Sequence, residues 1–136
     1  MGYSADAIEI DFTIPAENVA AALAAINASD VAARGFTPGT YASLIAAVED
    51  ITSFEDCTES DQGFSLGYHA DKYLSETEWL LRVLGKFAKE DSYVRFCGED
   101  YSFWGFKVIE GLLHEETGEV VWQDEGLNVE GRNTRT

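Results

Sequence analysis

The chain of 136 residues carries 25 acidic and 9 basic residues, which gives it a formal net charge of −16 at pH 7. A surface this negative argues against direct binding of nucleic acid or anionic lipid, because such binding needs cations to replace the counterions of the phosphates. The charge favours a basic protein surface as the partner. A hydrophobic content of 46% is sufficient for a packed core, so we expect a single domain over residues 1–124.

The N-terminal part of the chain predicts one strand followed by two helices. Residues 7–14, AIEIDFTI, alternate apolar and polar side chains, as a half-buried strand does. Pro15 suits the first turn of a helix, and the alanine-rich stretch after it predicts helix to about Ser29. Thr37-Pro38 repeats this start and predicts a second helix. Its apolar stripe consists of Tyr41, Leu44, Ile45 and Val48.

The middle of the chain predicts a hairpin and then a third helix. Residues 51–58 form a weakly patterned strand, residues 59–63 a polar turn, and residues 64–70 an alternating strand that returns beside the first. Ser75 and Glu78 have the spacing of a capping box, in which each side chain accepts a backbone hydrogen bond at the other's position. The buried stripe of this helix is Trp79, Leu80, Val83, Leu84 and Phe87.

The C-terminal part predicts a meander of four strands, at residues 92–98, 101–110, 112–116 and 119–123, joined by turns of reverse-turn composition. Strands joined by tight turns are antiparallel, so the order is β-α-α-β-β-α-β-β-β-β. We therefore expect an α+β fold in which helices cover one face of an antiparallel sheet of five to seven strands. The last residues, 125–136, are polar and predict a frayed tail.

Residues 95–111, RFCGEDYSFWGFKVIEG, combine aromatic, basic and acidic side chains with a cysteine. Alternation places Val94, Phe96, Trp104, Phe106 and Val108 on one buried face of a hairpin. The other face then holds Arg95, Cys97, Phe103 and Lys107. Packing explains the first face, and a binding role is the alternative for the second.

No motif for catalysis or for a cofactor is present. Cys97 as a nucleophile needs an activating base, and only His69 and His114 could serve. The same three residues are the candidates for a small-ligand or metal-binding enzyme, but nothing in their spacing brings them together. We expect both Cys57 and Cys97 to be reduced, no cofactor, and no enzymatic activity.

Negative charge is concentrated in residues 49–61, EDITSFEDCTESD, which hold six acidic residues and no basic one. If this stretch is exposed, its carboxylates can imitate backbone phosphates and occupy a nucleic-acid channel on a basic protein. The alternative is that the acidity only keeps the protein soluble. The predicted contact ridge consists of Glu49, Asp50, Glu55, Asp56, Glu59 and Asp61.

The segment Asp91-Ser-Tyr-Val-Arg-Phe-Cys-Gly-Glu-Asp100, followed by Trp104, Phe106 and the turn at Gly111, resembles a pattern in small acidic proteins of bacteria and their phages. In those proteins a helix precedes a Gly-Ser-Tyr strand and a Gly-Glu-Asp turn; here Asp91 replaces the first glycine. The resemblance covers residues 75–123 and carries no catalytic residues. It implies an accessory protein of a phage or mobile element, a group that includes inhibitors.

Together these observations predict a non-enzymatic acidic protein that inhibits a nucleic-acid-handling system of the host, such as a restriction or CRISPR effector, by charge mimicry. An immunity-type partner of a toxin is the alternative. The N-terminus has no signal-peptide features and no apolar run reaches membrane-spanning length, so we expect a cytoplasmic protein. Antiparallel edges and aromatic residues would also allow a homodimer.

Overall fold

The computed structural model describes residues 2–37 and 39–121. The strands are β1 (Ser4–Asp11), β2 (Thr13–Pro15), β3 (Phe54–Glu55), β4 (Thr58–Ser60), β5 (Gly63–Ser65), β6 (Tyr68–Lys72), β7 (Tyr93–Gly98), β8 (Phe103–Ile109) and β9 (Leu112–Gly118). The helices are α1 (Ala16–Asn27), α2 (Leu44–Ile51) and α3 (Glu76–Gly85), with a short 3-10 helix, η1 (Asp30–Arg34).

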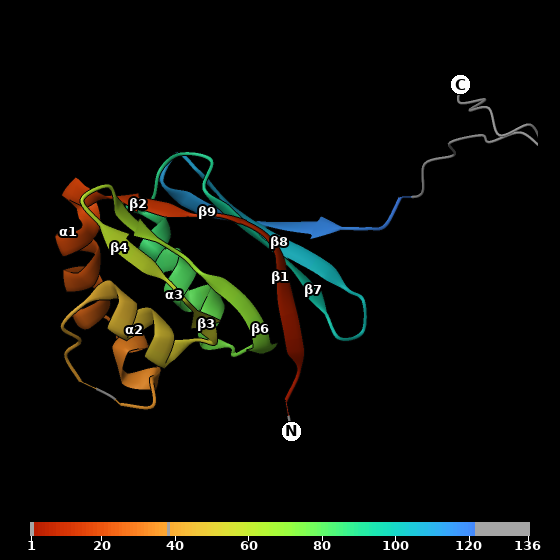
Figure 1. Ribbon diagram of the computed structural model, residues 1–136, viewed down its shortest axis with the longest axis horizontal. Coiled ribbons are helices and arrows are strands. Elements are labelled where there is room, and N and C mark those ends of the chain that lie inside the picture. Colours follow the sequence, from red (N-terminus) through yellow and green to blue (C-terminus); the bar gives the residue numbers. More distant parts are fainter. Residues whose placement is uncertain (1, 38, 122–136) are drawn as a thin grey trace, which may run out of the picture.

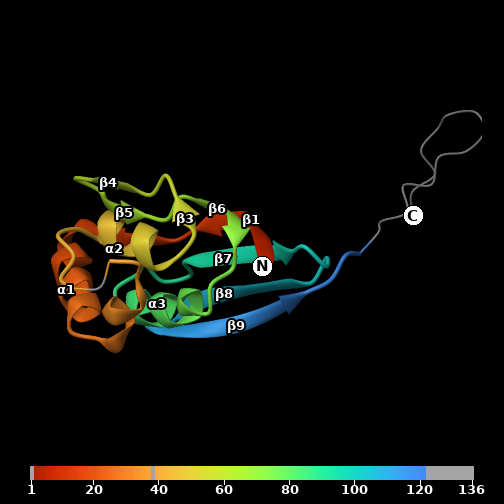
Figure 2. The ribbon, with the colours of Figure 1, turned by 90° about the horizontal axis from the view of Figure 1, so that it is seen from below.

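The predicted α+β fold is confirmed. Six strands form an antiparallel sheet in the order β3-β6-β1-β7-β8-β9, and a small sheet has the order β2-β5-β4 (Figure 1). In Figure 2, β4 and β5 lie on one side of the helices, and β9 lies on the other side. The strands therefore curve around the helices. The opposite face of the six-stranded sheet carries no helix in the described part of the chain.

The predicted hairpin of residues 51–58 and 64–70 exists, but both of its strands are broken. β3 and β6 pair in the large sheet, whereas β4 and β5 pair in the small one. The break lies where Gly67 passes so close to β3 that a Cβ at this position would be 1.7 Å from the carbonyl oxygen of Glu55. Asp56, at the same level, has a positive φ of 56°. The prediction of two continuous strands was therefore wrong, because the close approach at Gly67 leaves no pattern in the apolar residues.

The second helix begins later than predicted. Ser43 caps α2, with its Oγ accepting a hydrogen bond from the N–H of Ala46 at 3.1 Å. Thr37 lies in a loop, where its backbone N–H donates to Asp50 Oδ2 at 2.9 Å. Pro38 is outside the described residues. The expected start at Thr37-Pro38 was wrong because a tertiary contact to the end of α2 holds this segment in the loop.

The third helix is present, but the capping box is not. Ser75 has helical backbone angles, and its Oγ donates to Glu76 Oε2 at 3.2 Å instead of capping the helix. Glu78 pairs with Arg82 one turn later, at 2.7 Å. The competing ion pair thus takes the carboxylate that the capping box requires.

The buried stripe of α3 is also displaced from the expected one. Trp79 is 41% exposed, and the guanidinium carbon of Arg34 lies 3.4 Å from the centre of its ring. Leu81 is fully buried in its place, because the helix is enclosed by other helices as well as by the sheet.

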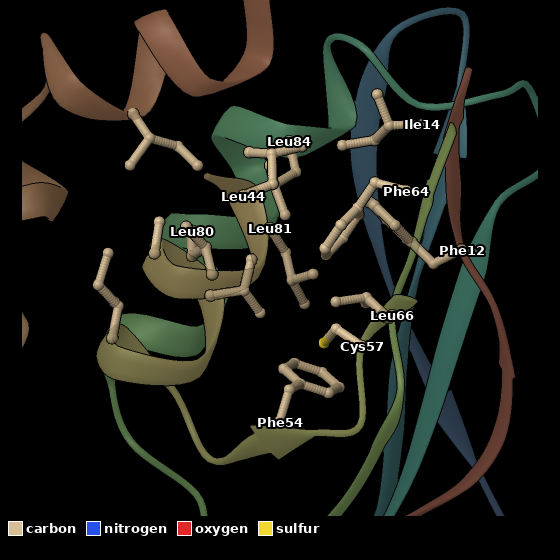
Figure 3. Close-up of a cluster of buried hydrophobic side chains, with 14 of the residues drawn as sticks. Phe12, Ile14, Leu44, Phe54, Cys57, Phe64, Leu66, Leu80, Leu81 and Leu84 are labelled. Carbon is tan, nitrogen blue, oxygen red and sulfur yellow. The ribbon is translucent and has the colours of Figure 1, made fainter. Parts of the chain in front are cut away.

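The core joins the helices to both sheets. Figure 3 shows side chains from α2 and α3 pointing toward residues of the β1–β2 and β3–β6 segments. Its fully buried members include Phe12, Ile14, Leu44, Phe54, Phe64, Leu80, Leu81 and Leu84.

The hairpin of β7 and β8 has the predicted faces, with Val94, Phe96, Phe106 and Val108 buried. The predicted strand at residues 119–123 is wrong for residues 119–121, which form no strand. Gly118 already pairs with Phe103, the first residue of β8, so residues 119–121 have no partner on that strand. Residues 122–123, the predicted boundary at residue 124 and the tail at 125–136 lie outside the described residues. Within the described ranges, no helix is long and apolar enough to cross a membrane.

Candidate functional site

The six residues of the predicted ridge lie along one stretch of chain from the end of α2 to the turn before β5. They are Glu49 and Asp50 in α2, Glu55 in β3, Asp56 after it, Glu59 in β4, and Asp61 in the turn. β3 and β4 are edge strands of their sheets. The ridge is therefore on an edge of the protein, but its members have different surroundings.

Glu49 and Asp50 are used by the fold itself. Glu49 Oε2 accepts a hydrogen bond from the N–H of Cys57 at 3.0 Å. Asp50 Oδ2 accepts two, from the N–H of Thr37 at 2.9 Å and from the hydroxyl of Tyr41 at 2.7 Å. Burial and the neighbouring Asp50 carboxylate raise the pKa of Tyr41 to about 12. These two carboxylates hold loops in place and are poorly placed to leave their donors for a partner.

The other four acidic residues are free for contact; we call Glu55, Asp56, Glu59 and Asp61 the β3–β4 carboxylates. All four are exposed, and among the described residues none forms an ion pair. Glu55 lies opposite Tyr68 on β6, and its nearby carboxylate raises the pKa of Tyr68. At about 3.3 Å per extended residue, the four span up to about 20 Å. The arrangement presents a row of negative charge along an edge.

The second candidate surface is the uncovered face of the six-stranded sheet. Arg95, Cys97, Phe103 and Lys107 lie there, as the alternation predicted. Arg95 forms ion pairs with Glu9 on β1 at 2.9 Å and with Glu116 on β9 at 3.4 Å. These carboxylates raise the pKa of Arg95, with the hydrogen bond to Glu9 as the largest cause. Its positive charge is therefore already matched within the fold.

A hollow of about 390 Å³ lies on this face. Its floor is at Gly105, where a Cβ would come within 2.7 Å of the Val94 carbonyl oxygen and 2.9 Å of Arg95 Cγ. Its walls include Ile8, Phe103, Glu116 and Gly118. Sequence reasoning missed Ile8 and Glu116, because only the pairing of β1 and β9 with the central hairpin brings them to it. The available sequence signal for the hollow was the glycine in each of two neighbouring strands, Gly105 in β8 and Gly118 in β9.

The structure does not bring together the residues of the enzyme alternative. His69 is buried on the helix-covered side of the sheet, whereas Cys97 is on the uncovered side. His114 pairs with Lys107, and Cys97 pairs with Phe103, four residues away along β8. That separation is about 13 Å at the rise of a strand. Among the described residues, no group of three or more His, Cys, Asp and Glu side chains could hold a metal ion.

His69 has a structural position instead. Its Nδ1 is 2.8 Å from the carbonyl oxygen of Ala5, which requires a proton on that nitrogen. Phe54 and Phe96 meet the imidazole edge-on, with centroid distances of 5.2 and 5.3 Å. Burial lowers the pKa of His69, so the ring is neutral at pH 7. It serves as a member of the aromatic core.

Both cysteines are free. Cys57 is buried, and its Sγ accepts a hydrogen bond from the N–H of Gly67 at 3.3 Å. Burial, followed by the nearby Glu49 carboxylate, raises the pKa of Cys57 to about 11. A thiol that stays protonated is a poor nucleophile and a poor metal ligand.

No protein-family model, no curated protein and no solved structure matches this chain. The resemblance over residues 75–123 therefore stays a prediction, and any function must be argued from the surfaces described above.

Proposed function

We propose that this protein is a non-enzymatic binding protein that docks on a basic protein surface through the β3–β4 carboxylates. In its specific form, the carboxylates occupy the phosphate-binding channel of a nucleic-acid-handling protein and inhibit it. The observation that carries the proposal is the row of four exposed acidic side chains that have no ion-pair partner among the described residues.

The charge geometry supports this form of binding. One strand of DNA carries a charge about every 3.4 Å along its axis, so a stretch of about 20 Å presents roughly six phosphates. Four carboxylates over a similar length give a density of negative charge of the same order. Exposed on an edge, they can reach into a groove without unfolding anything, whereas Glu49 and Asp50 would have to break hydrogen bonds that they make within the fold.

The two free cysteines support a reducing compartment, and the proposal places the protein in the cytoplasm. An immunity-type partner of a toxin is the second candidate, and the hollow at Gly105 favours it. Such a complex would depend on a few residues in a close-fitting site, rather than on charge spread over an edge.

The test is affinity capture with two matched variants. In the ridge variant, Glu55→Lys, Glu59→Lys and Asp61→Lys reverse three of the β3–β4 carboxylates. In the control variant, Asp11→Lys, Asp30→Lys and Glu110→Lys change the net charge by the same amount at other exposed positions. Circular dichroism and thermal unfolding establish that both variants are folded.

Each protein is immobilised, exposed to a lysate of the native host at low salt, and eluted with rising salt. We expect wild type and control to retain a nucleic-acid-binding protein, which duplex DNA or RNA then displaces. The ridge variant should retain little of it. Equal retention by the ridge variant, or failure of nucleic acid to displace the captured protein, would contradict charge mimicry.

A further inference from the structure

Among residues 2–37 and 39–121, no strand pairs with the outer edge of the C-terminal half of β9, which we call the free edge. β9 ends the six-stranded sheet and pairs only with β8 in the described part of the chain. Near its start, Leu113 packs against Gly85 of α3. Its other end extends past the helices, as Figures 1 and 2 both show. Glu115, Thr117 and Gly118 are exposed there.

The hydrogen-bond register shows which backbone groups point to this edge. Ile109 and Leu112 flank a two-residue turn, so they bond to each other, and bonded pairs then alternate along the hairpin. Val108 confirms the register, because its N–H and carbonyl bond to Ser92 and Asp91 on the side away from β9. The backbone groups of Leu113, Glu115 and Thr117 therefore point away from β8. Those of Glu115 and Thr117 lie in the exposed half.

The acidic side chains along this edge disfavour pairing with another acidic strand. Glu115, Glu116 and Glu119 make the edge negative, and of these only Glu116 has an ion-pair partner among the described residues. A second copy of β9 would place like charges opposite one another, which destabilises cross-strand pairing. An added strand that carries lysine or arginine would instead neutralise them.

The hollow at Gly105 reaches as far as β9, because Glu116, Thr117 and Gly118 are among its lining residues. Gly118 lies between its floor and the free edge and has no side chain to close it. A residue opposite Gly118 on an added strand would be on the uncovered face of the sheet. A long basic side chain at that position could lie over Gly118 against Phe103, with its charge near Glu116 and Glu119.

We propose that the free edge of β9, at Glu115–Gly118, is a docking site for an extended basic segment of a partner protein. The segment adds to the sheet as a strand, with one long basic side chain seated in the hollow. This site and the start of the β3–β4 carboxylates lie at opposite edges of the six-stranded sheet, β9 and β3, which are five strand spacings or about 24 Å apart along the sheet. The two sites are independent.

The probe is a fluorescent heptapeptide of alternating lysine and valine, added to the full chain at near-physiological salt. One comparison peptide has glutamate in place of lysine. Another keeps the lysines but carries N-methyl groups on alternate backbone nitrogens, which leaves its charge unchanged and blocks strand pairing. We expect the lysine peptide to bind and both comparison peptides to bind about tenfold or more weakly.

Thr117→Pro removes one free-edge donor without breaking a bond to β8, and edge strands tolerate proline. Thr117→Val is the matched control that keeps the donor. We expect Thr117→Pro to weaken binding of the lysine peptide about tenfold, with Thr117→Val and the ridge variant close to wild type. The amide NMR signals of Glu115 and Thr117 should shift on binding.

Equal binding of the N-methylated peptide, or undiminished binding by a folded Thr117→Pro variant, would overturn the proposal. A homodimer that Thr117→Pro dissociates would overturn it too, because a second copy would then occupy the edge. Loss of peptide binding in the ridge variant would place the peptide on the β3–β4 carboxylates instead. If only the peptide experiments fail, the lysate result for the ridge variant still decides the proposed function.

Discussion

Single residues show how the surroundings of a side chain decide its role. His69 is a residue type that often catalyses or binds metal, yet its Nδ1 bonds to the Ala5 carbonyl. Its Nε2 is buried and has no hydrogen-bond partner among the described residues. A proton on Nε2 would place a charge among the rings of Phe54, Tyr73 and Phe96. The residue therefore makes the stability of the fold depend on pH.

Because the pKa of His69 is lowered in the folded state, His69 stabilises the fold less at acidic pH. The unfolded chain has a His69 pKa near 6.5 and takes up the proton first as the pH falls. The stabilising contribution is complete above about pH 6.5 and is lost as the pH falls from there toward the folded-state pKa. The loss is at most about 1.4 kcal/mol per pH unit.

The measurement compares urea unfolding of wild type and His69→Phe between pH 7.5 and 5. The difference in unfolding free energy should shift in favour of His69→Phe as the pH falls. Titration of the many carboxylates affects both proteins and cancels in the difference. If the difference in unfolding free energy stays constant over this range, His69 takes up its proton equally in the folded and the unfolded chain, which would contradict the prediction.

Among the strands, the interruption that divides β3 from β4 and β5 from β6 depends on Gly67. The backbone of the neighbouring strand fills the space that a side chain would need at this position. The break also sets where the β3–β4 carboxylates lie, because β4 leaves the large sheet at this point.

We expect Gly67→Ala to destabilise the protein by about 3 kcal/mol or more, since backbone atoms must move to admit the methyl group. Gly85→Ala in α3 is the control. Its added Cβ would lie at least 3.6 Å from Val108 and Leu113, an ordinary contact, and alanine favours helix by up to about 1 kcal/mol. Chemical denaturation of both variants should give changes of opposite sign, and a neutral Gly67→Ala would refute the close approach.

At the scale of the whole molecule, net charge is the dominant feature. Repulsion among the carboxylates opposes the compact state, and salt screens it. The described residues hold four ion pairs, which involve three cations, Arg82, Arg95 and Lys107. They are too few to balance 25 acidic residues.

Stability should therefore rise with ionic strength. Between about 0.01 and 0.5 M sodium chloride, we expect the free energy of urea unfolding to increase by roughly 1 kcal/mol or more, because the Debye length shortens from about 30 Å to a few ångströms. The ridge variant is less negatively charged, so its unfolding free energy should increase less with salt. A decrease with salt would mean that attractive ion pairs outweigh the repulsion.

Residue patterns along the chain predicted the fold class, the order of most elements and the buried face of the β7–β8 hairpin. These properties depend on local alternation and helical spacing, which the physical chemistry of burial imposes on neighbouring residues. The sequence also located the acidic stretch from Glu49 to Asp61, since charge density is a property of composition.

Contacts between distant segments determine which of those acidic residues are free. Glu49 and Asp50 bond to Cys57, Thr37 and Tyr41, which are 8 to 13 residues away in the chain. The break at Gly67, the hollow over Gly105 and the free edge of β9 also arise from contacts between distant segments. Such contacts leave no local periodicity, because the packing that selects them exists only after the strands have paired.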